Sequence, residues 1–255
     1  MKRSFLAAVL LFVVVLSASA AYCSVMDRDT IRLGTESTYP PFEYRNDKNE
    51  IVGYDIDVAK AIAESIGKKI EVVDMAFDAL IPALLTGKID LVAAGMTNTE
   101  ERRKKVDFSD VYYDVENAFV VKAGTAPAST LQAFKGKIAA VQIGTVQDTY
   151  ITGTGLPSEV KRFQKNDDAL MEVMLGRADF SVLNLTVANS FLRKNKAFEG
   201  KLQISFRNNI YTKGEGIALA LPKGDEGFLK AVNGAIQAMK KNGRFAELKK
   251  KYEMD

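Results

Sequence analysis

Arg102 is the residue of this sequence best placed for chemistry with an anion. It follows an apolar run at residues 89–94, and Thr97 lies between that run and the arginine. An apolar run in which polar and apolar residues do not alternate is typical of a parallel strand covered by helices on both faces. Ligands of open α/β sheets bind where such strands end, and a planar guanidinium there suits a carboxylate. The alternative is a solvated basic face, because three more basic residues follow at 103–105.

Two aromatic residues and one helix start are further candidates. Tyr39 and Phe77 lie in loops beside regular elements, where a ring is either a plug of the core or a surface for a ligand. In the second role, such rings accommodate aliphatic stems and flat cations such as guanidinium. Residues 144–146 begin a helix directly after a strand, so their free N–H groups can hold an anion.

The composition excludes several classes of site. The 255 residues include no histidine, so imidazole metal ligands and Ser-His or Cys-His nucleophile pairs are absent. The single cysteine allows neither an internal disulfide nor a cysteine cluster for zinc. The formal net charge of +3 falls to about +1 once Lys2 and Arg3 are removed. We therefore expect no metal, no cofactor and no nucleic-acid partner.

The first 21 residues are a predicted secretory signal peptide. A basic start at 2–3, an apolar run at 5–16 and small residues at 17–21 match the three parts of such a signal. The apolar run is shorter than the roughly 20 residues that cross a membrane. We expect cleavage after residue 20 or 21 and a periplasmic or extracellular mature protein. Cys23 suggests a lipid anchor as the weaker alternative, because Tyr22 occupies a position where lipidation sites have a small residue.

Strands and helices alternate in two series, which indicates an α/β protein with two lobes. In the first series, a helix at 55–66 is followed by strands at 70–73 and 89–94, with a second helix between them that we expect Asp78 to cap. The second series has strands at 137–142, 159–163 and 179–183, and helices from 145, at 167–175 and at 186–195.

Two extended apolar segments, 118–123 and 216–222, bracket the second series. We expect them to be a pair of strands that cross between the lobes. A last helix at 226–239 has a continuous apolar face and ends at Asn242 and Gly243. We expect this helix to pack on the first lobe.

The order of six motifs resembles the polar amino acid family of bacterial extracellular solute-binding proteins, which serve ATP-driven importers. The motifs are GTESTYPPFE at 34–43, VGYDID at 52–57, FDALIPAL at 77–84, AGMT at 94–97 with Arg102, VDFS at 106–109 and QIGT at 142–145. The resemblance implies a two-lobed periplasmic-binding-protein fold, each lobe a mostly parallel sheet flanked by helices, with a two-strand hinge. It implies a discontinuous lobe 1 at 24–118 and 219–255, and lobe 2 at 119–218 with the hinge strands at its ends.

The resemblance also implies a ligand-binding set: Glu36, Tyr39, Phe77, Ala94, Gly95, Thr97, Arg102, Gln142, Gly144, Thr145, Val146 and Asn184. In the family pattern the first arginine of the basic run holds the ligand carboxylate, which leaves residues 103–105 on the surface. Tyr39 and Phe77 would sandwich the ligand side chain. Glu36 matches a position at the far end of the ligand, where an acid favours a cationic tip; its alternative is a surface carboxylate paired with a lysine.

Two positions depart from the family pattern. Val146 replaces a threonine of many relatives, so a hydroxyl donor is lost. Asn184 replaces the usual aspartate that pairs with the α-ammonium group of the ligand, and it offers a carbonyl acceptor without the charge. Two ligand classes stay open: a cationic amino acid with compensation from Glu36, or a ligand whose amine is substituted, absent or differently placed.

We therefore expect a monomeric receptor that captures a polar amino acid, arginine-like or lysine-like, or a derivative, and delivers it to the membrane permease of an ABC importer. Capture would proceed by hinge closure. One alternative is an enzyme on the same fold, similar to cyclohexadienyl dehydratases. Asn184 argues against it, because a carboxamide cannot act as a general acid. A second alternative is a sensor protein that presents its ligand to a membrane receptor.

Overall fold

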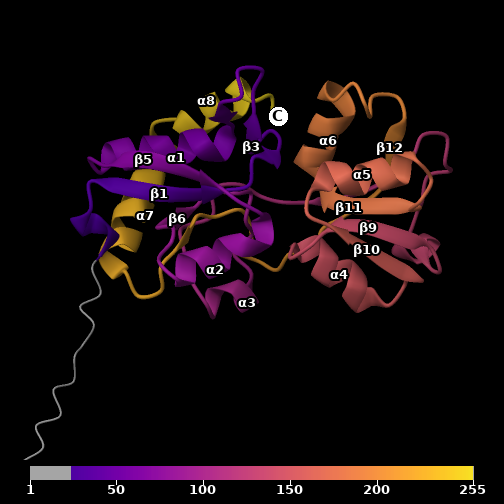
Figure 1. Cartoon of the computed structure of the whole chain (residues 1–255), viewed down its shortest axis with the longest axis horizontal. Coiled ribbons are helices and arrows are strands. Elements are labelled where there is room, and N and C mark those ends of the chain that lie inside the picture. Colours follow the sequence, from indigo (N-terminus) through magenta and orange to yellow (C-terminus); the bar gives the residue numbers. More distant parts are fainter. Residues whose placement is uncertain (1–23, 255) are drawn as a thin grey trace, which may run out of the picture.

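The computed structural model describes residues 24–254 and has two halves, each built around a five-stranded sheet (Figure 1). The predicted signal peptide and Cys23 lie outside the described residues. The first half is the part of the chain that builds the first sheet and its helices, and the second half is the part that builds the second sheet and its helices. The first sheet has the order β5 (Lys69–Asp74), β1 (Thr30–Thr35), β6 (Leu91–Val92), β13 (Ala220–Leu221) and β7 (Asp107–Phe108). The second has the order β10 (Glu159–Phe163), β9 (Ile138–Gln142), β11 (Phe180–Asn184), β8 (Asn117–Lys122) and β12 (Leu202–Asn208).

The two sheets share one pattern of strand directions. In each, the first three strands are parallel and the last two are joined by antiparallel ladders. A small third sheet, which the sequence analysis did not predict, packs beside the first half and consists of β2 (Thr38–Tyr39), β3 (Glu43–Arg45) and β4 (Ile51–Val52). The fold is therefore the mixed α/β type that the sequence predicted.

Helices cover both faces of each large sheet (Figure 1). Those of the first half are α1 (Tyr54–Ser65), α2 (Leu80–Leu85), α3 (Glu100–Arg103), α7 (Glu226–Lys241) and α8 (Arg244–Lys251). Those of the second half are α4 (Val146–Thr154), α5 (Asn166–Met174) and α6 (Leu185–Lys194). Short 3-10 helices are η1 (Val25–Asp27), η2 (Phe77–Ala79) and η3 (Leu131–Phe134). Asp78 lies inside η2 and caps no helix, which corrects the prediction, because a 3-10 turn precedes α2 and the N-cap position falls on Ala79.

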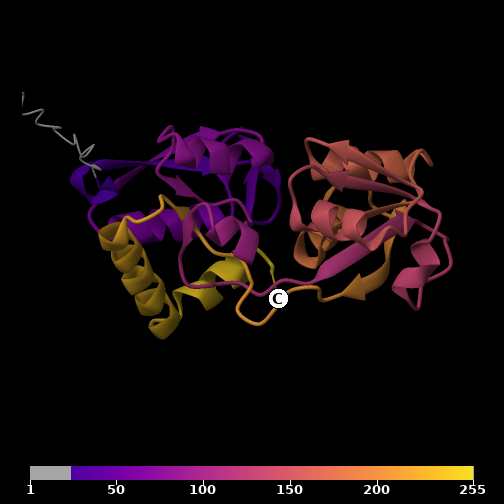
Figure 2. The same ribbon diagram turned by 90° about the horizontal axis from the view of Figure 1, so that it is seen from below.

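The chain passes between the halves twice, and Figure 2 shows both connections on one side of the molecule. The first, 109–116, runs from β7 to β8, and the second, 209–219, runs from β12 to β13. The connections pair with each other, because the N–H of Ile217 donates to the carbonyl of Tyr113 at 2.9 Å. The expected crossing segment 118–123 instead falls mainly on β8, which is bound on both sides by strands of the second sheet. The lobe boundaries given above remain a prediction.

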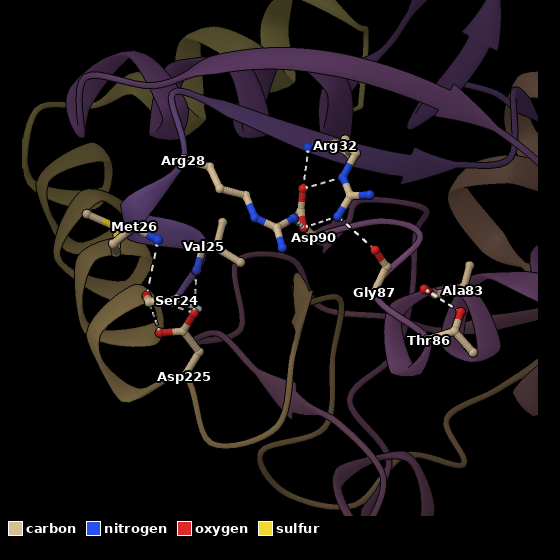
Figure 3. A network of polar contacts seen from close by, with 10 residues as sticks. All are labelled: Ser24, Val25, Met26, Arg28, Arg32, Ala83, Thr86, Gly87, Asp90 and Asp225. Carbon is tan, nitrogen blue, oxygen red and sulfur yellow. Dashed lines mark hydrogen bonds and ion pairs between the residues drawn. The ribbon is translucent and has the colours of Figure 1, made fainter. Parts of the chain in front are cut away.

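Buried polar anchors tie the C-terminal helices to the first half (Figure 3). Asp225 caps α7 by accepting from the N–H of Phe228 at 3.2 Å, and it also accepts from the N–H of Val25 at 2.9 Å. Elsewhere in Figure 3, Asp90 accepts from Arg32 Nε at 2.8 Å. Burial opposes the charge of Asp90, but the bonds from Arg32 hold the pKa of its carboxyl below the ordinary value. The second C-terminal helix, α8, begins just after the point where the sequence analysis ended the chain's last helix.

Candidate functional site

A pocket with an empty volume of about 370 Å³ lies between the two halves. All of the predicted site residues except Gly144 line it, together with two that were not predicted, Gln147 and Tyr211. The first half contributes its lining from the loops and short elements that follow β1, β5 and β6, and the second half from the ends of β9 and β11 and the segments that follow them. These are the carboxyl ends of parallel strands, where the sequence predicted a ligand site. Tyr211 is the exception in this lining, because it comes from the connection that follows the antiparallel strand β12.

Arg102 enters the pocket from α3 and is held there by backbone carbonyls. Its Nη1 donates to the carbonyl of Thr97 at 2.9 Å, and its Nη2 donates across the cleft to the carbonyl of Gly144 at 3.0 Å. Among residues 24–254, no carboxylate lies within ion-pair distance of its guanidinium. Desolvation lowers the pKa of Arg102 to about 10, so the side chain is still charged at neutral pH. A cation without a protein counter-ion is therefore available to an anion in the pocket.

The remaining basic residues of that run have other partners. Lys104 and Lys105 follow α3, are exposed and pair with the glutamates of α3 four residues earlier. Arg103 is only half-buried and donates through Nη1 to the carbonyl of Asn98. The prediction of a surface position is therefore met by the two lysines, whereas Arg103 also packs down on the backbone beside the site.

Gly144 lies beside the pocket rather than in its lining, and its predicted ligand contact stays a prediction. Its carbonyl accepts from Arg102, and its backbone φ of +75° lies in the left-handed region that favours glycine. A Cβ added there would meet Cβ of Asp78 in the first half at 3.1 Å. Gly144 thus allows the backbones of the two halves to approach closely beside Arg102.

The two predicted aromatic residues have different partners. The ring of Phe77 lies under Arg102, with the guanidinium carbon 5.4 Å from the ring centroid. Tyr39 stacks on Phe42, with ring centroids 5.9 Å apart. A Cβ added at Gly95 would lie 2.6 Å from Cε1 of Tyr39, so this glycine leaves the room that the tyrosine ring fills. Both rings line the pocket, and Phe77 also positions the arginine by a cation–π contact.

The start of α4 presents backbone donors to the pocket. Thr145 is its N-cap; the hydroxyl accepts from the N–H of Asp148 at 3.1 Å and donates to the carbonyl of Gln142 at 2.8 Å. The hydroxyl is thereby occupied within the protein. The N–H groups of Val146 and Gln147 lie in the first turn, where they have no partner inside the helix, and they can hold an anion.

Glu36 lies at another wall of the same pocket and is 5% exposed. It accepts from the hydroxyl of Thr38 and, across the cleft, from Nε2 of Gln142 at 3.4 Å. Burial raises the pKa of Glu36, although these hydrogen bonds oppose the rise. A cationic group brought into the pocket would favour the ionised carboxylate and so would be held by it. The alternative of a surface carboxylate paired with a lysine does not fit this burial.

Asn184 lines the pocket, but its oxygen is turned away from it. Oδ1 is the N-cap acceptor of α6 and accepts from the N–H of Thr186 at 2.8 Å and of Val187 at 3.4 Å. From the sequence we expected a carbonyl acceptor for the ligand at this position. That expectation is wrong because the end of β11 is also the start of α6, whose free N–H groups take the oxygen.

Three residues form an amide and hydroxyl network that the sequence analysis missed. Nε2 of Gln147 lies 2.9 Å from Oδ1 of Asn117, and the hydroxyl of Tyr211 donates to the same oxygen at 2.8 Å. Gln147 follows the recognised motif by two residues, so its place on the first turn of α4 was a usable signal. Tyr211 comes from the connection 209–219, which has no periodic pattern, and only the fold brings it to the pocket.

Two fully buried carboxyl groups lie in the first half, close to the pocket. Glu43 has no hydrogen-bond partner for either oxygen, and Oδ2 of Asp55 accepts from the N–H of Gly95 at 2.8 Å. Burial raises the pKa of Glu43 well above its ordinary value and that of Asp55 to about 7. Within the described part of the chain, no group of His, Cys, Asp and Glu side chains is arranged to hold a metal ion, and no helix is long and apolar enough to cross a membrane.

Comparison with known proteins agrees with this geometry. Residues 31–255 match the model of the bacterial extracellular solute-binding proteins, family 3. The L-arginine-binding protein of Pseudomonas aeruginosa is 34% identical over 229 residues, 87% of each chain. An ancestral arginine-binding protein, solved with arginine bound, is 39% identical with a TM-score of 0.81 over 88% of this chain and 98% of that one.

A second similar structure bears on the enzymatic alternative. An ancestral amino acid-binding protein, described as a precursor of cyclohexadienyl dehydratase, is 35% identical with a TM-score of 0.78, over 89% of this chain and 97% of that one. The family match spans nearly all of the described residues and includes both walls of the pocket. The chain belongs to the bacterial extracellular solute-binding proteins of family 3.

Proposed function

We propose that this protein is an extracytoplasmic receptor that captures a small α-carboxylate with a cationic side chain and delivers it to the permease of an ABC importer. The observation that carries the proposal is Arg102, a desolvated cation in the pocket without a protein counter-ion. The N-terminus of α4 lines the same pocket from the second half. A carboxylate between them would receive charge-assisted bonds from both halves.

The cationic side chain is proposed from the opposite sign of charge at Glu36. This carboxylate is buried in the same pocket, and no arginine or lysine is within ion-pair distance of it among the described residues. A carboxylate and a guanidinium that line one pocket suit a ligand with both charges, such as an arginine-like or lysine-like compound. Two similar proteins support this class: the L-arginine-binding protein of Pseudomonas aeruginosa and the ancestral arginine-binding protein with arginine bound.

Capture by closure of the two halves is part of the proposal. Bonds already cross the cleft from Arg102 to Gly144 and from Gln142 to Glu36, and a third joins the hydroxyls of Tyr113 and Thr186 at 3.0 Å. Only two chain connections join the halves, so a hinge motion requires backbone changes in two segments alone. Small-angle scattering should record a smaller radius of gyration at saturating ligand than without ligand; an unchanged curve would contradict closure.

Export and the absence of catalysis complete the proposal. We propose cleavage of the signal peptide and release of a monomer into the periplasm or the extracellular space. We also propose that the pocket performs no turnover, because Asn184 has no ionisable proton to give to a leaving group. Incubation of the purified protein with prephenate or arogenate should leave both compounds unchanged, and loss of either would contradict this assignment.

A thermal-shift screen of the purified mature protein tests the binding proposal. The panel contains the twenty amino acids, polyamines, guanidino compounds and the 2-hydroxy analogues of arginine and lysine. A ligand at 100 times its dissociation constant stabilises the folded protein by about 2.7 kcal/mol, which shifts the melting temperature visibly. We expect shifts only from compounds with both a carboxylate and a cationic tail. Shifts from polyamines alone, or from none of the compounds, would refute the proposal.

A further inference from the structure

The side chain of Asn184 determines which polar atom the second half presents at the end of β11. The residue is 3% exposed and lines the pocket. Its Oδ1 accepts from two backbone N–H groups of α6, at 2.8 and 3.4 Å. Of the two polar atoms of the side-chain amide, only the oxygen can accept a hydrogen bond from a backbone N–H. These two bonds therefore fix the positions of Oδ1 and Nδ2. Nδ2 is therefore the polar atom left for the pocket, and among residues 24–254 no protein oxygen accepts from it.

The neighbouring polar atoms of the second half are also mostly donors. The hydroxyl of Thr145 is occupied, and the free N–H groups of the first turn of α4 point out of its N-terminus. Oε1 of Gln142 already accepts from Nδ2 of Asn166 at 2.6 Å. The one exception is Oε1 of Gln147, whose amide nitrogen is bound to Asn117 and Tyr211. This wall therefore presents mainly hydrogen-bond donors to the ligand, and a ligand group that fits it must be a hydrogen-bond acceptor.

An ammonium group fits such a wall poorly. It has three donors and no acceptor, so beside Nδ2 of Asn184 both groups would lose hydrogen bonds in a partly dry cleft. A hydroxyl or carbonyl oxygen in the same place would accept from Nδ2. We propose that the natural ligand is a 2-hydroxy or 2-oxo acid with a cationic tail, an inference that rests on the proposed function. The oxygen beside its carboxylate would take the place of the α-ammonium of an amino acid.

The test compares two ligands that differ only at this atom: L-arginine and (S)-2-hydroxy-5-guanidinopentanoate. Isothermal titration calorimetry at pH 7.5 measures both against the wild-type mature protein and against Asn184→Asp. Aspartate caps a helix as well as asparagine does, so Oδ1 keeps its two backbone bonds and an oxygen replaces Nδ2. We expect the wild type to bind the hydroxy acid at least tenfold more tightly than L-arginine, and the variant to reverse this preference.

A matched control separates a local effect from the added charge. Asn189→Asp makes the same amide-to-carboxylate change five residues further along α6, where the side chain does not line the pocket, and unfolding curves of the free variants check that both are folded. We expect Asn189→Asp to leave the preference for the hydroxy acid in place. A wild type that binds L-arginine more tightly, or an equal reversal by Asn189→Asp, would overturn the inference while leaving the proposed function intact. Failure of both ligands to bind would overturn the proposed function and the inference with it.

Discussion

The two walls of the cleft come from halves of the same architecture but carry different chemistry. Both sheets begin with three parallel strands and end with antiparallel ladders, and in both the pocket residues follow the parallel strands. The first half supplies the charged groups, Arg102 and Glu36. The second half supplies neutral groups only: backbone N–H groups of α4 and the amides of Gln142, Gln147 and Asn184. The connection 209–219 adds the hydroxyl of Tyr211.

This difference indicates a division of roles between capture and selection. Charged groups act at longer range than hydrogen bonds, so a ligand would be drawn to the first half while the cleft is open. Neutral donors and acceptors discriminate only at contact distance, when the second half has closed on the ligand. The first half should therefore set most of the affinity, and the second half should set which atom is accepted beside the ligand carboxylate.

The largest effect that we expect concerns the buried acids of the first half. Burial raises the pKa of Asp55 to about 7. Between about pH 4 and pH 7 the unfolded chain loses this proton while the folded protein retains it, so wild-type stability falls as the pH rises. Asp55→Asn removes this titration. The free energy of unfolding of the variant relative to wild type should rise by roughly 4 kcal/mol from pH 4 to pH 8, measured by urea unfolding.

Asp90 provides the control of opposite sign in the same half. The pKa of its carboxyl is held below the ordinary value by Arg32, so its stabilising contribution is present at neutral pH and is lost as the pH falls. Asp90→Asn should therefore cost most at neutral pH and least in acid. In the second half, the buried Asp148 is paired with Arg162, whereas Asp55 of the first half has no basic partner among the described residues. If the stability of Asp55→Asn depended on pH in the same way as that of Asp90→Asn, this difference between the halves would have no effect on stability.

Arg102→Ala should have the next largest effect and should act mainly on binding. Loss of a bidentate bond to the ligand carboxylate should weaken binding at least 100-fold, about 3 kcal/mol, for whichever ligand the screen identifies. The unliganded melting temperature should fall only slightly, because the variant loses two hydrogen bonds to backbone carbonyls and the contact with Phe77 but no ion pair. Calorimetry measures the affinity, and Lys104→Ala, from the same basic run but exposed, is the control. A comparable loss in Lys104→Ala would mean that the whole run attracts the ligand.

The sequence predicted elements well where local periodicity decides them. Helix α4 begins at Val146, one residue after the predicted start at residue 145, and β10 spans the predicted residues. The residues of the apolar run at 89–94 are buried as predicted, but only Leu91 and Val92 form a strand, β6. The prediction that Asp78 caps α2 was wrong because the 3-10 helix η2, which contains Asp78, precedes α2.

For the site, the sequence identified residues but not how their atoms are used. Arg102 and Glu36 line the pocket as the motifs implied. The polarity of Asn184 was misjudged because residue type alone does not say which end of an amide faces a ligand. An asparagine between a strand and a helix is a common N-cap, so capping preference was the unused signal. No local signal could join Gln147, Asn117 and Tyr211, which come from three distant segments.

Glu36→Gln should have a smaller effect, limited to ligands with a cationic tail. Loss of the carboxylate should weaken binding of a guanidino ligand about tenfold, because one charge-assisted contact becomes neutral. The matching ureido compound, which has the same shape without the charge, should bind equally to both proteins. Calorimetry with each pair of compounds gives the comparison. Equal losses for the charged and the uncharged ligand would show that Glu36 shapes the pocket, and the division into a charged and a neutral wall would then fail.

Val146→Thr should give the smallest effect, a gain of about threefold in affinity for the ligand carboxylate. Val146 is the first residue of α4, lines the pocket and has a side chain of nearly the size of threonine. The new hydroxyl would add a neutral donor beside the free N–H groups of the first turn, worth somewhat less than the roughly 1 kcal/mol of an ordinary hydrogen bond because it must give up water. Val146→Ala is the control, since it changes the wall without adding a donor. The gain should be the same for L-arginine and its 2-hydroxy analogue, because the carboxylate is common to both. A gain for only one of them would mean that the first turn of α4 contacts the atom beside the carboxylate, and that selection at this wall is shared between residue 146 and Asn184.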